Sequence, residues 1–327
     1  MFKYIIKRII LMPVIMILAT ILIFIFINLN PVDPTHQMLP AEYTEEQHQA
    51  LRDELGLNDP LPIRYFNWVK GIITEGDWGM SYATRDSVWN EIGFRIPTTV
   101  KLAILTVLTV LIIGTPLGIL CATKQYRAPD SIINVISKLL GAFPQFWLAL
   151  MLMLLFCNKL GWFPAYGIKT ASSWVLPVVT LALPNIAGFI RNTRSAMLDC
   201  IRQDYINTAR SKGAREGIVI WRDALKNAAL PMITILGSTF ANLIGNAVVV
   251  EKVFAIPGIG SKVIEAINTN DIPVVLACTV IISAIFIVMT LVIDIAYAIV
   301  DPRIKAAFAG SSARKKEERM MRKGAVS

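Results

Sequence analysis

The 327-residue sequence is poor in charge, histidine and cysteine. Only 17% of its residues are charged, whereas a soluble domain carries about a quarter. The two histidines, His36 and His48, make a weak metal-ligand set, and we expect no metal site. The four cysteines show no CxxC or CxH spacing, so no zinc or redox site is indicated, and we expect them to be small packing residues. They are Cys121, Cys157, Cys200 and Cys278.

A phosphate-binding loop is also missing. No GxxxxGK[ST] motif occurs in the sequence, although backbone cradling of phosphates needs that spacing. The segment from Gly258 to Lys262 lacks the spacer between its first glycine and Gly-Lys, so we expect a sharp turn there. No Ser/His/Asp or paired-carboxylate arrangement suggests catalysis. We therefore expect a chain that is not an enzyme and binds no cofactor, so any ATP hydrolysis must come from another chain.

Long apolar runs are what the sequence has instead, and its mean hydropathy is +0.57. A run of about 20 apolar residues can cross the hydrocarbon core of a bilayer. The first extends from Ile9 to about Leu29 without a cleavage-site pattern, which indicates a retained helix rather than a signal peptide. The pattern predicts an all-α integral membrane protein with six transmembrane helices. The other five lie at residues 98–123, 133–157, 173–195, 230–250 and 274–299.

Composition divides the chain into four segments. Residues 1–30 combine a short basic tip with the first transmembrane helix. Residues 31–97 are polar and rich in proline breaks, which favours a small helical domain outside the membrane. Residues 98–301 form a five-helix core, and residues 302–327 form a basic tail.

Local signals place two helices within residues 31–97. Thr44 and Gln47 have the spacing of a capping box, and Gly56 is expected to end the helix that follows. A second helix is expected from about residue 60 to residue 73. Its apolar side chains at helical spacing are Phe66, Val69 and Ile73.

The distribution of positive charge predicts the orientation. Segments 1–8, 124–138, 191–229 and 300–327 carry 22 of the 32 lysines and arginines. Loops rich in Lys and Arg remain in the cytoplasm. We therefore expect a multi-pass protein of the cell (cytoplasmic) membrane with both termini in the cytoplasm and residues 31–97 outside. The net charge of +9 lies beside apolar runs, so we do not expect a nucleic-acid partner.

The loop at residues 199–229 carries the strongest functional signal. Asp204 could cap a short helix, and Gly213 could end it with a left-handed backbone. Another protein could approach the small residues Thr208, Ala209 and Ala214 closely. Charge around that contact would come from Arg210, Lys212 and Arg215. A second, amphipathic helix would present Ile218, Trp221 and Leu225 on one face.

The residues alone leave two interpretations of this loop open. It could dock on a partner protein, or it could be a basic amphipathic helix lying on anionic lipid. Leu230 and Pro231 follow it, and we expect Pro231 near the start of the next helix, where a missing N–H costs little.

The loop resembles the coupling loop of ABC importer permeases. Asn207-Thr208-Ala209 stands where that family has Glu-Ala-Ala, Gly213 stands at its glycine, and Leu230-Pro231 at its terminal Leu-Pro. The missing acid and the longer spacing resemble the peptide/nickel branch of the family. Further segments resemble the same branch, in order along nearly the whole chain. They are 55–61, 64–68, 76–81, 251–260, 271–273 and 301–303.

The resemblance implies an assembly with other proteins. It implies a second homologous permease, two ATP-binding-cassette ATPases that bind ATP and magnesium, and an extracytoplasmic substrate-binding protein. The implied function is uptake of di- or oligopeptides, with nickel complexes or glutathione as alternatives. The implied residues for ATPase coupling are Asp204, Thr208, Ala209, Arg210, Gly213, Ala214, Leu230 and Pro231.

Two further sets of candidates lie elsewhere in the chain. The candidates for docking the binding protein are Asp77, Trp78, Phe254, Pro257 and Gly258. Asn242 and Asn246 could line the translocation path, or could equally hydrogen-bond between helices. A stand-alone secondary transporter is the main rival class, but such folds often show internal repeats, and none is visible here. A membrane-anchored scaffold would need only one transmembrane helix.

Overall fold

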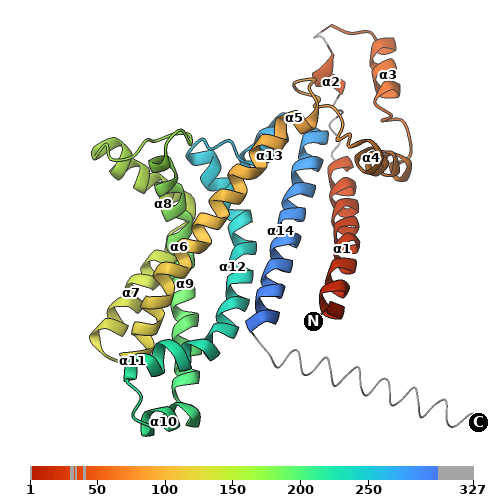
Figure 1. Cartoon of the computed structure of the whole chain (residues 1–327). Helices are drawn as coiled ribbons and strands as arrows, with labels where there is room; N and C mark the ends of the chain where they lie inside the picture. The colour runs from red at the N-terminus through yellow and green to blue at the C-terminus, as the bar shows by residue number, and fades with distance from the viewer. Residues whose placement is uncertain (1, 30–32, 34, 40–41, 301–327) are drawn as a thin grey trace, which may run out of the picture.

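The structure is a computed structural model that describes residues 2–29, 33, 35–39 and 42–300. These residues form helices and connecting turns, with no strand among them. Figure 1 shows long, roughly parallel helices that run between two ends of the molecule. The upper end carries α3, α4 and α13, and the lower end carries α10 and α11. The predicted tail at residues 302–327 lies outside the described residues.

Five long helices form the frame. Four of them contain stretches that are apolar and long enough to cross a membrane by themselves: Ile9–Asn28, Val88–Thr123, Ala171–Ile201 and Ile272–Ile293. The stretches at Val88 and Ala171 include the short turns that precede α6 and α9. Two bent pairs of helices bring the number to six if each pair crosses once, so the predicted all-α membrane fold is confirmed. The five helices are α1 (Phe2–Asn28), α6 (Ile96–Thr123), α9 (Val175–Ile201), α12 (Leu225–Val253) and α14 (Ile272–Val300).

The segment predicted as one helix at residues 133–157 is broken. Helix α7 (Ala128–Ala142) and the stretch from α8 (Gln145–Leu152) through a π-helical turn (Met153–Lys159) meet at an angle of 101°. Phe143 is extended at the break, with φ −76° and ψ 133°. The ring of Pro144 disfavours helical backbone in the residue before it. The hydropathy of an apolar run does not predict this break, because hydropathy carries no information on backbone conformation.

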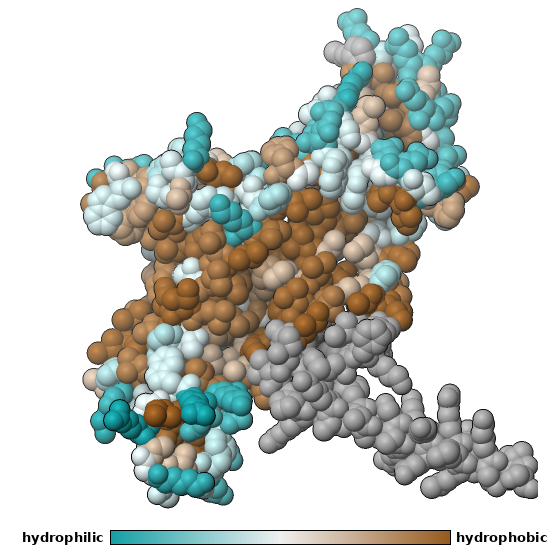
Figure 2. All heavy atoms as spheres, viewed as in Figure 1, coloured by the Kyte–Doolittle hydropathy of each residue, from teal (hydrophilic) through white to brown (hydrophobic). Residues whose placement is uncertain are grey.

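The upper end is built from shorter helices: α2 (Thr35–Met38), α3 (Glu45–Glu54), α4 (Leu61–Glu75), α5 (Val88–Ile92) and α13 (Ile259–Asn268). The predicted capping box at the start of α3 is confirmed, since the Gln47 N–H donates to Thr44 Oγ1 and the Thr44 N–H donates to Gln47 Oε1. Gly56 follows the end of α3 with φ +63°, as predicted. On the face seen in Figure 2, apolar side chains predominate along the middle of the long helices, and polar ones gather at both ends.

The centre of the bundle is the contact between α6 and α9. Gly114 and Gly118, one turn apart, let the two backbones approach closely. A Cβ on Gly118 would lie 2.6 Å from Thr193 Cβ and 3.2 Å from the Ile190 carbonyl oxygen. Small residues at such spacing are the usual means of close helix packing in membranes. Helix α12 packs against α9, and α14 packs against α1 and α12.

Gly118→Ala should therefore destabilise the protein. The added methyl group has no room against α9, and such overpacking costs about 1–3 kcal/mol. We expect a lower midpoint of thermal denaturation for the purified protein in detergent. Gly188→Ala is the matched control, because its Cβ would meet nothing within 4 Å. Equal midpoints for the two variants would contradict the packing argument.

Candidate functional site

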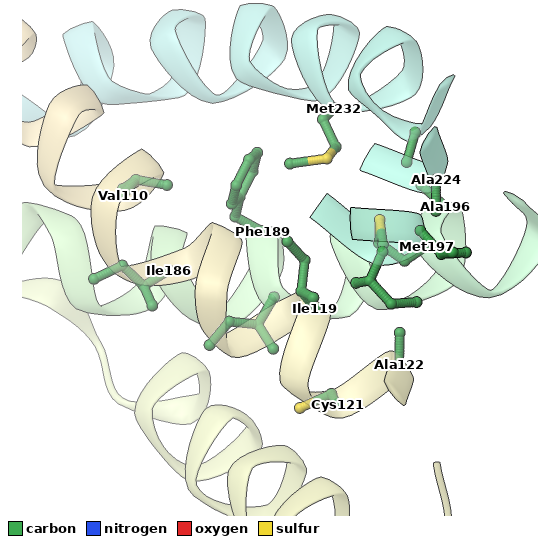
Figure 3. Close-up of a cluster of buried hydrophobic side chains, with 14 of the residues drawn as sticks. Val110, Ile119, Cys121, Ala122, Ile186, Phe189, Ala196, Met197, Ala224 and Met232 are labelled. Carbon is green, nitrogen blue, oxygen red and sulfur yellow. The ribbon is translucent and has the colours of Figure 1, made fainter. Parts of the chain in front are cut away.

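The loop between α9 and α12 is anchored in the core of the bundle. Ile206, on α10 (Asp204–Ser211), is fully buried. It belongs to one apolar cluster with residues of α6, α9 and the start of the α12 helix (Figure 3). Ala209 and Ala214 pack against the same cluster. Other members of the cluster are Cys121, Ala122, Met197, Val219, Ile220 and Ala224. Helix α10 is therefore packed against the long helices through Ile206.

Gly213 makes the turn that follows α10. Its φ is +79°, in the left-handed region, as predicted. The Gly213 N–H donates to the Arg210 carbonyl oxygen at 2.9 Å, and the Ala214 N–H donates to the Ala209 carbonyl oxygen at 3.3 Å. A Cβ on Gly213 would meet nothing within 4 Å. The requirement for glycine is therefore one of backbone conformation, which costs other residues about 1–2 kcal/mol.

An ion pair closes this turn. Arg210 Nε donates to Glu216 Oε2 at 3.1 Å, and its Nη2 donates to Oε1 at 2.7 Å. The hydrogen bonds to Glu216 raise the pKa of the Arg210 guanidinium. Arg210 thus pairs with a residue of its own chain, whereas Lys212 and Arg215 make no ion pair with any described residue. These two cations lie on the exposed surface of the loop.

Two local predictions about the loop were wrong. Gln203, not Asp204, occupies the N-cap of α10 and makes no side-chain cap; Asp204 is the first helical residue, where its charge still favours the helix dipole. The expected apolar face was also misplaced. Ile218 and Trp221 are exposed, Trp221 by 53%. Leu225, the third expected member, is partly buried against the cluster, and the fully buried side chains are Val219, Ile220 and Ala224.

A π-helical turn lies at the misplaced face. Residues Val219–Ala224 form it, between α11 (Glu216–Ile218) and α12. Bonds from i to i+5 widen the turn, and the buried positions 219, 220, 224 and 228 recur four or five residues apart, beside the predicted positions 218 and 221. Helix α11, this turn and the first part of α12 run on as one helix that begins at Glu216. Pro231 therefore lies well inside it rather than near its start. Leu230 is partly buried and Pro231 exposed.

A buried carboxylate that the sequence analysis missed organises the upper end. Glu251 is fully buried. It accepts hydrogen bonds from Thr99 Oγ1 at 2.7 Å and from the Ser261 N–H at 2.9 Å. A Cβ on Gly258 would lie 2.1 Å from Glu251 Cδ. The glycines are thus shaped around a carboxylate, and the sharp turn expected from Gly258 to Lys262 is instead the N-cap and first turn of α13.

Two further buried polar contacts tie the upper loops together. Lys262 Nζ lies 2.6 Å from Glu91 Oε2, and both side chains are nearly buried. Asp271 accepts hydrogen bonds from Ser81 Oγ and from the Tyr82 N–H. The partners are far apart in sequence, so no local pattern could have paired them. Together they fasten the segment before α6 to α13 and the start of α14.

The five candidate docking residues occupy different environments. Asp77 is exposed and accepts a hydrogen bond from the Gly79 N–H at 2.8 Å, and Trp78 stacks on Trp89 with 5.8 Å between ring centroids. Both line a cavity of about 400 Å³ with residues of α1, α4 and α14. Pro257 is partly buried. Phe254 and Gly258 lie beneath the surface.

The two candidate path residues lie on α12. Asn246 is exposed. The backbone of Asn242 is helical, and its side chain lies outside the described part of the chain. Helix α12 bends by 46° in this region, between Phe240 and Leu243.

The bundle of membrane-length apolar helices, with an anchored polar loop at one end, defines a multi-pass membrane protein. The sequence model of the family described as binding-protein-dependent transport system inner membrane component matches residues 114–306. The model of the N-terminal part of such membrane components matches residues 1–103. The chain belongs to this family. It is the permease subunit of an ABC importer, and such subunits are not themselves catalytic.

Curated relatives match over nearly the whole chain. The oligopeptide transport system permease protein AppB of Bacillus subtilis is 37% identical and aligns over 93% of this chain and 100% of its own length. The dipeptide transport system permease protein DppB of Alkalihalophilus pseudofirmus is 35% identical, with coverages of 93% and 100%. The glutathione transport system permease protein GsiC of Salmonella typhimurium is 34% identical, with coverages of 93% and 99%.

A solved structure shares the fold. It is an inward-facing form of the MetNI methionine ABC transporter. The TM-score is 0.51 at 18% sequence identity, and the match covers 64% of this chain and 96% of that one. Such a likeness concerns the fold alone.

Lys262→Met should be strongly destabilising. It removes one partner of a nearly buried ion pair and leaves Glu91 uncompensated, which costs about 3–5 kcal/mol. Adding Glu91→Gln should recover part of that loss. Glu265→Gln is the control, because Glu265 is a half-exposed second partner of Lys262 at 3.1 Å and exposed pairs contribute little. Thermal denaturation of the purified proteins compares the stability of the single variant, the double variant and the control. Equal losses of stability for Lys262→Met and Glu265→Gln would contradict the assignment of Glu91 as the main partner of Lys262.

Proposed function

We propose that this permease forms, with a second homologous permease, the path for di- or oligopeptides delivered by an extracytoplasmic binding protein. Two separate ATPase subunits, which bind ATP and magnesium, drive it. The names of the relatives support a peptide: two refer to oligopeptide and dipeptide transport, and glutathione is itself a small peptide. The same architecture could import nickel complexes, so substrate choice rests on a direct uptake assay.

The observation that carries the proposal is the anchoring of α10 through Ile206. A surface loop that only lay on lipid would need no connection to the core. Here the loop exposes Asp204, Thr208 and Lys212 while Ile206 and Ala209 join the cluster shared by α6, α9 and α12. Force applied to the exposed side is therefore delivered to the long helices. This is the property that a docking site for an ATPase requires.

The proposed cycle uses this connection. The positive-inside pattern supports a cytoplasmic position for the loop and both termini and an outer position for the upper end. Closure of the ATPases on ATP pulls the coupling loop (residues 199–229), and α9 and α12 rock to open the path outward. Substrate enters, and hydrolysis resets the path. In this scheme Arg210 acts mainly by fixing the turn at Gly213. Ala214 follows that turn, and Leu230 and Pro231 follow the loop in the sequence.

The upper end is the proposed docking face for the binding protein. It comprises the outer part of residues 31–97 and the loop at 251–273. Asp77, Trp78 and Pro257 have surface available for contact, whereas Phe254 and Gly258 support the loop from beneath. Asn246, and Asn242 one turn before it, are proposed to line the path along α12.

Gly213→Trp should uncouple transport. A non-glycine residue at φ +79° strains the turn, and the indole would project where the partner docks. We expect peptide uptake by the reconstituted transporter to fall about tenfold or more, within the usual range of coupling free energies, while the protein still inserts and purifies. Uptake and ATP hydrolysis are measured together in vesicles.

Gly217→Trp is the matched control, because Gly217 is also exposed, has no atom within 4 Å of its Cβ, and has helical backbone. Undiminished uptake by Gly213→Trp would count against the coupling role. Accumulation of peptide by vesicles that hold this chain without any ATPase would instead favour a secondary transporter.

A further inference from the structure

Helix α4 leaves its most apolar side uncovered. Phe66 is 66% exposed and Ile73 77% exposed, and Val69 between them is only partly buried. These three side chains lie on one stripe of the helix, at i, i+3 and i+7. A helix of a water-soluble domain would turn this stripe toward its own core. In α4 the two ends of the stripe, Phe66 and Ile73, are instead largely uncovered by the described residues.

A different side of α4 attaches it to α1. Tyr65 Oη lies 2.8 Å from Thr20 Oγ1, within hydrogen-bond distance. The rings of Tyr65 and Trp68 lie 5.4 Å and 6.2 Å from the ring of Phe24. The helix is therefore fixed against α1 by one side, with the apolar stripe on the neighbouring side.

The contacts on α1 give the depth of α4. The membrane-length stretch of α1 ends at Asn28. At a rise of about 1.5 Å per residue, Phe24 lies about 6 Å and Thr20 about 12 Å below that end. Both contact residues thus lie within the stretch that crosses the bilayer. A helix held at this level cannot stand clear of the membrane.

The third side of α4 is polar from Asn67 onward, although Ile63, nearer the start of the helix, is also exposed there. Asn67, Lys70 and Thr74 are exposed there. The helix thus has one side on α1, one apolar side and one polar side, and its aromatic residues Tyr65 and Trp68 suit the boundary between headgroups and acyl chains. This is the pattern of a helix that lies in the plane of the membrane interface.

We propose that α4 lies in the lipid–water interface of the leaflet at the upper end, with Phe66, Val69 and Ile73 among the acyl chains. The occupant of the stripe is lipid rather than protein because the stripe is uncharged and lies at the depth at which the opposite side of α1 exposes Leu22, Ile25 and Phe26. In Figure 2 the apolar side chains along the long helices reach the level of α4. Residues 60–75 are thus part of the membrane-bound body and not of an outer domain, independently of substrate and coupling.

Spin labelling tests the placement. Single cysteines replace Phe66 or Ile73 on the apolar stripe, and Asn67 or Thr74 on the polar side, in the full-length chain with its native cysteines changed to alanine. Each variant carries a nitroxide and is reconstituted in phosphatidylethanolamine–phosphatidylglycerol vesicles. Collision with oxygen reports the acyl region, and collision with an aqueous nickel chelate reports water. We expect the oxygen-to-nickel ratio to be several-fold higher at positions 66 and 73, at a depth of about 5–10 Å.

Two results would overturn the proposal. Nickel collision at positions 66 and 73 as frequent as at 67 and 74 would place the stripe in water. Protection from both reagents that arises only when the second permease or the binding protein is added would assign the stripe to a protein partner. If the cysteine-free chain does not fold, a background that keeps the buried Cys121 and Cys278 allows the same comparison.

Discussion

The close approach of α6 and α9 is the constraint on which the rest of the structure depends. Gly114 and Gly118 allow it, because any larger residue would collide with Phe189 or Thr193. The two helices then share one apolar cluster, and α12 and the coupling loop complete it. A permease must transmit movement from one end to the other, and such movement needs a body that does not deform. Close packing of small residues supplies that rigidity at this contact.

The two ends of the molecule solve different problems with polar groups. At the lower end the Arg210–Glu216 pair is exposed and serves to shape a turn, so its net contribution to stability is small. At the upper end Glu251, Lys262 and Asp271 are buried and fully engaged, and each joins segments that are distant in the sequence. The lower end is thus a well-shaped surface for a partner. The loops of the upper end are held together as one unit, so a partner that binds there would not move them separately.

The placement of α4 changes how the first hundred residues are understood. Polar composition and proline breaks suggested a domain outside the membrane, and α2 and α3 do project from the upper end (Figure 1). Helix α4, however, is attached to α1 at the level of Phe24 and Thr20. With α4 as an interfacial support, α1 is held from two sides, by α4 and by α14. Such support suits a peripheral helix with little contact to the central bundle.

Composition and local turn chemistry were enough to determine the class of the protein. Apolar runs fixed most of the long helices, the capping box placed α3, and Gly213 and Gly56 marked their turns, because each of these signals acts over a few residues. The break at Pro144, the π-helical turn at Val219–Ala224 and the buried side of the helix around it depended on backbone geometry that hydropathy does not encode. The pairs Glu251–Thr99 and Lys262–Glu91, and the exposure of Phe66 and Ile73, were decided only by tertiary structure. A buried charge is stable only beside its partner, and an apolar stripe can face either a protein core or lipid. The roles of these residues could therefore be assigned only once their surroundings were known.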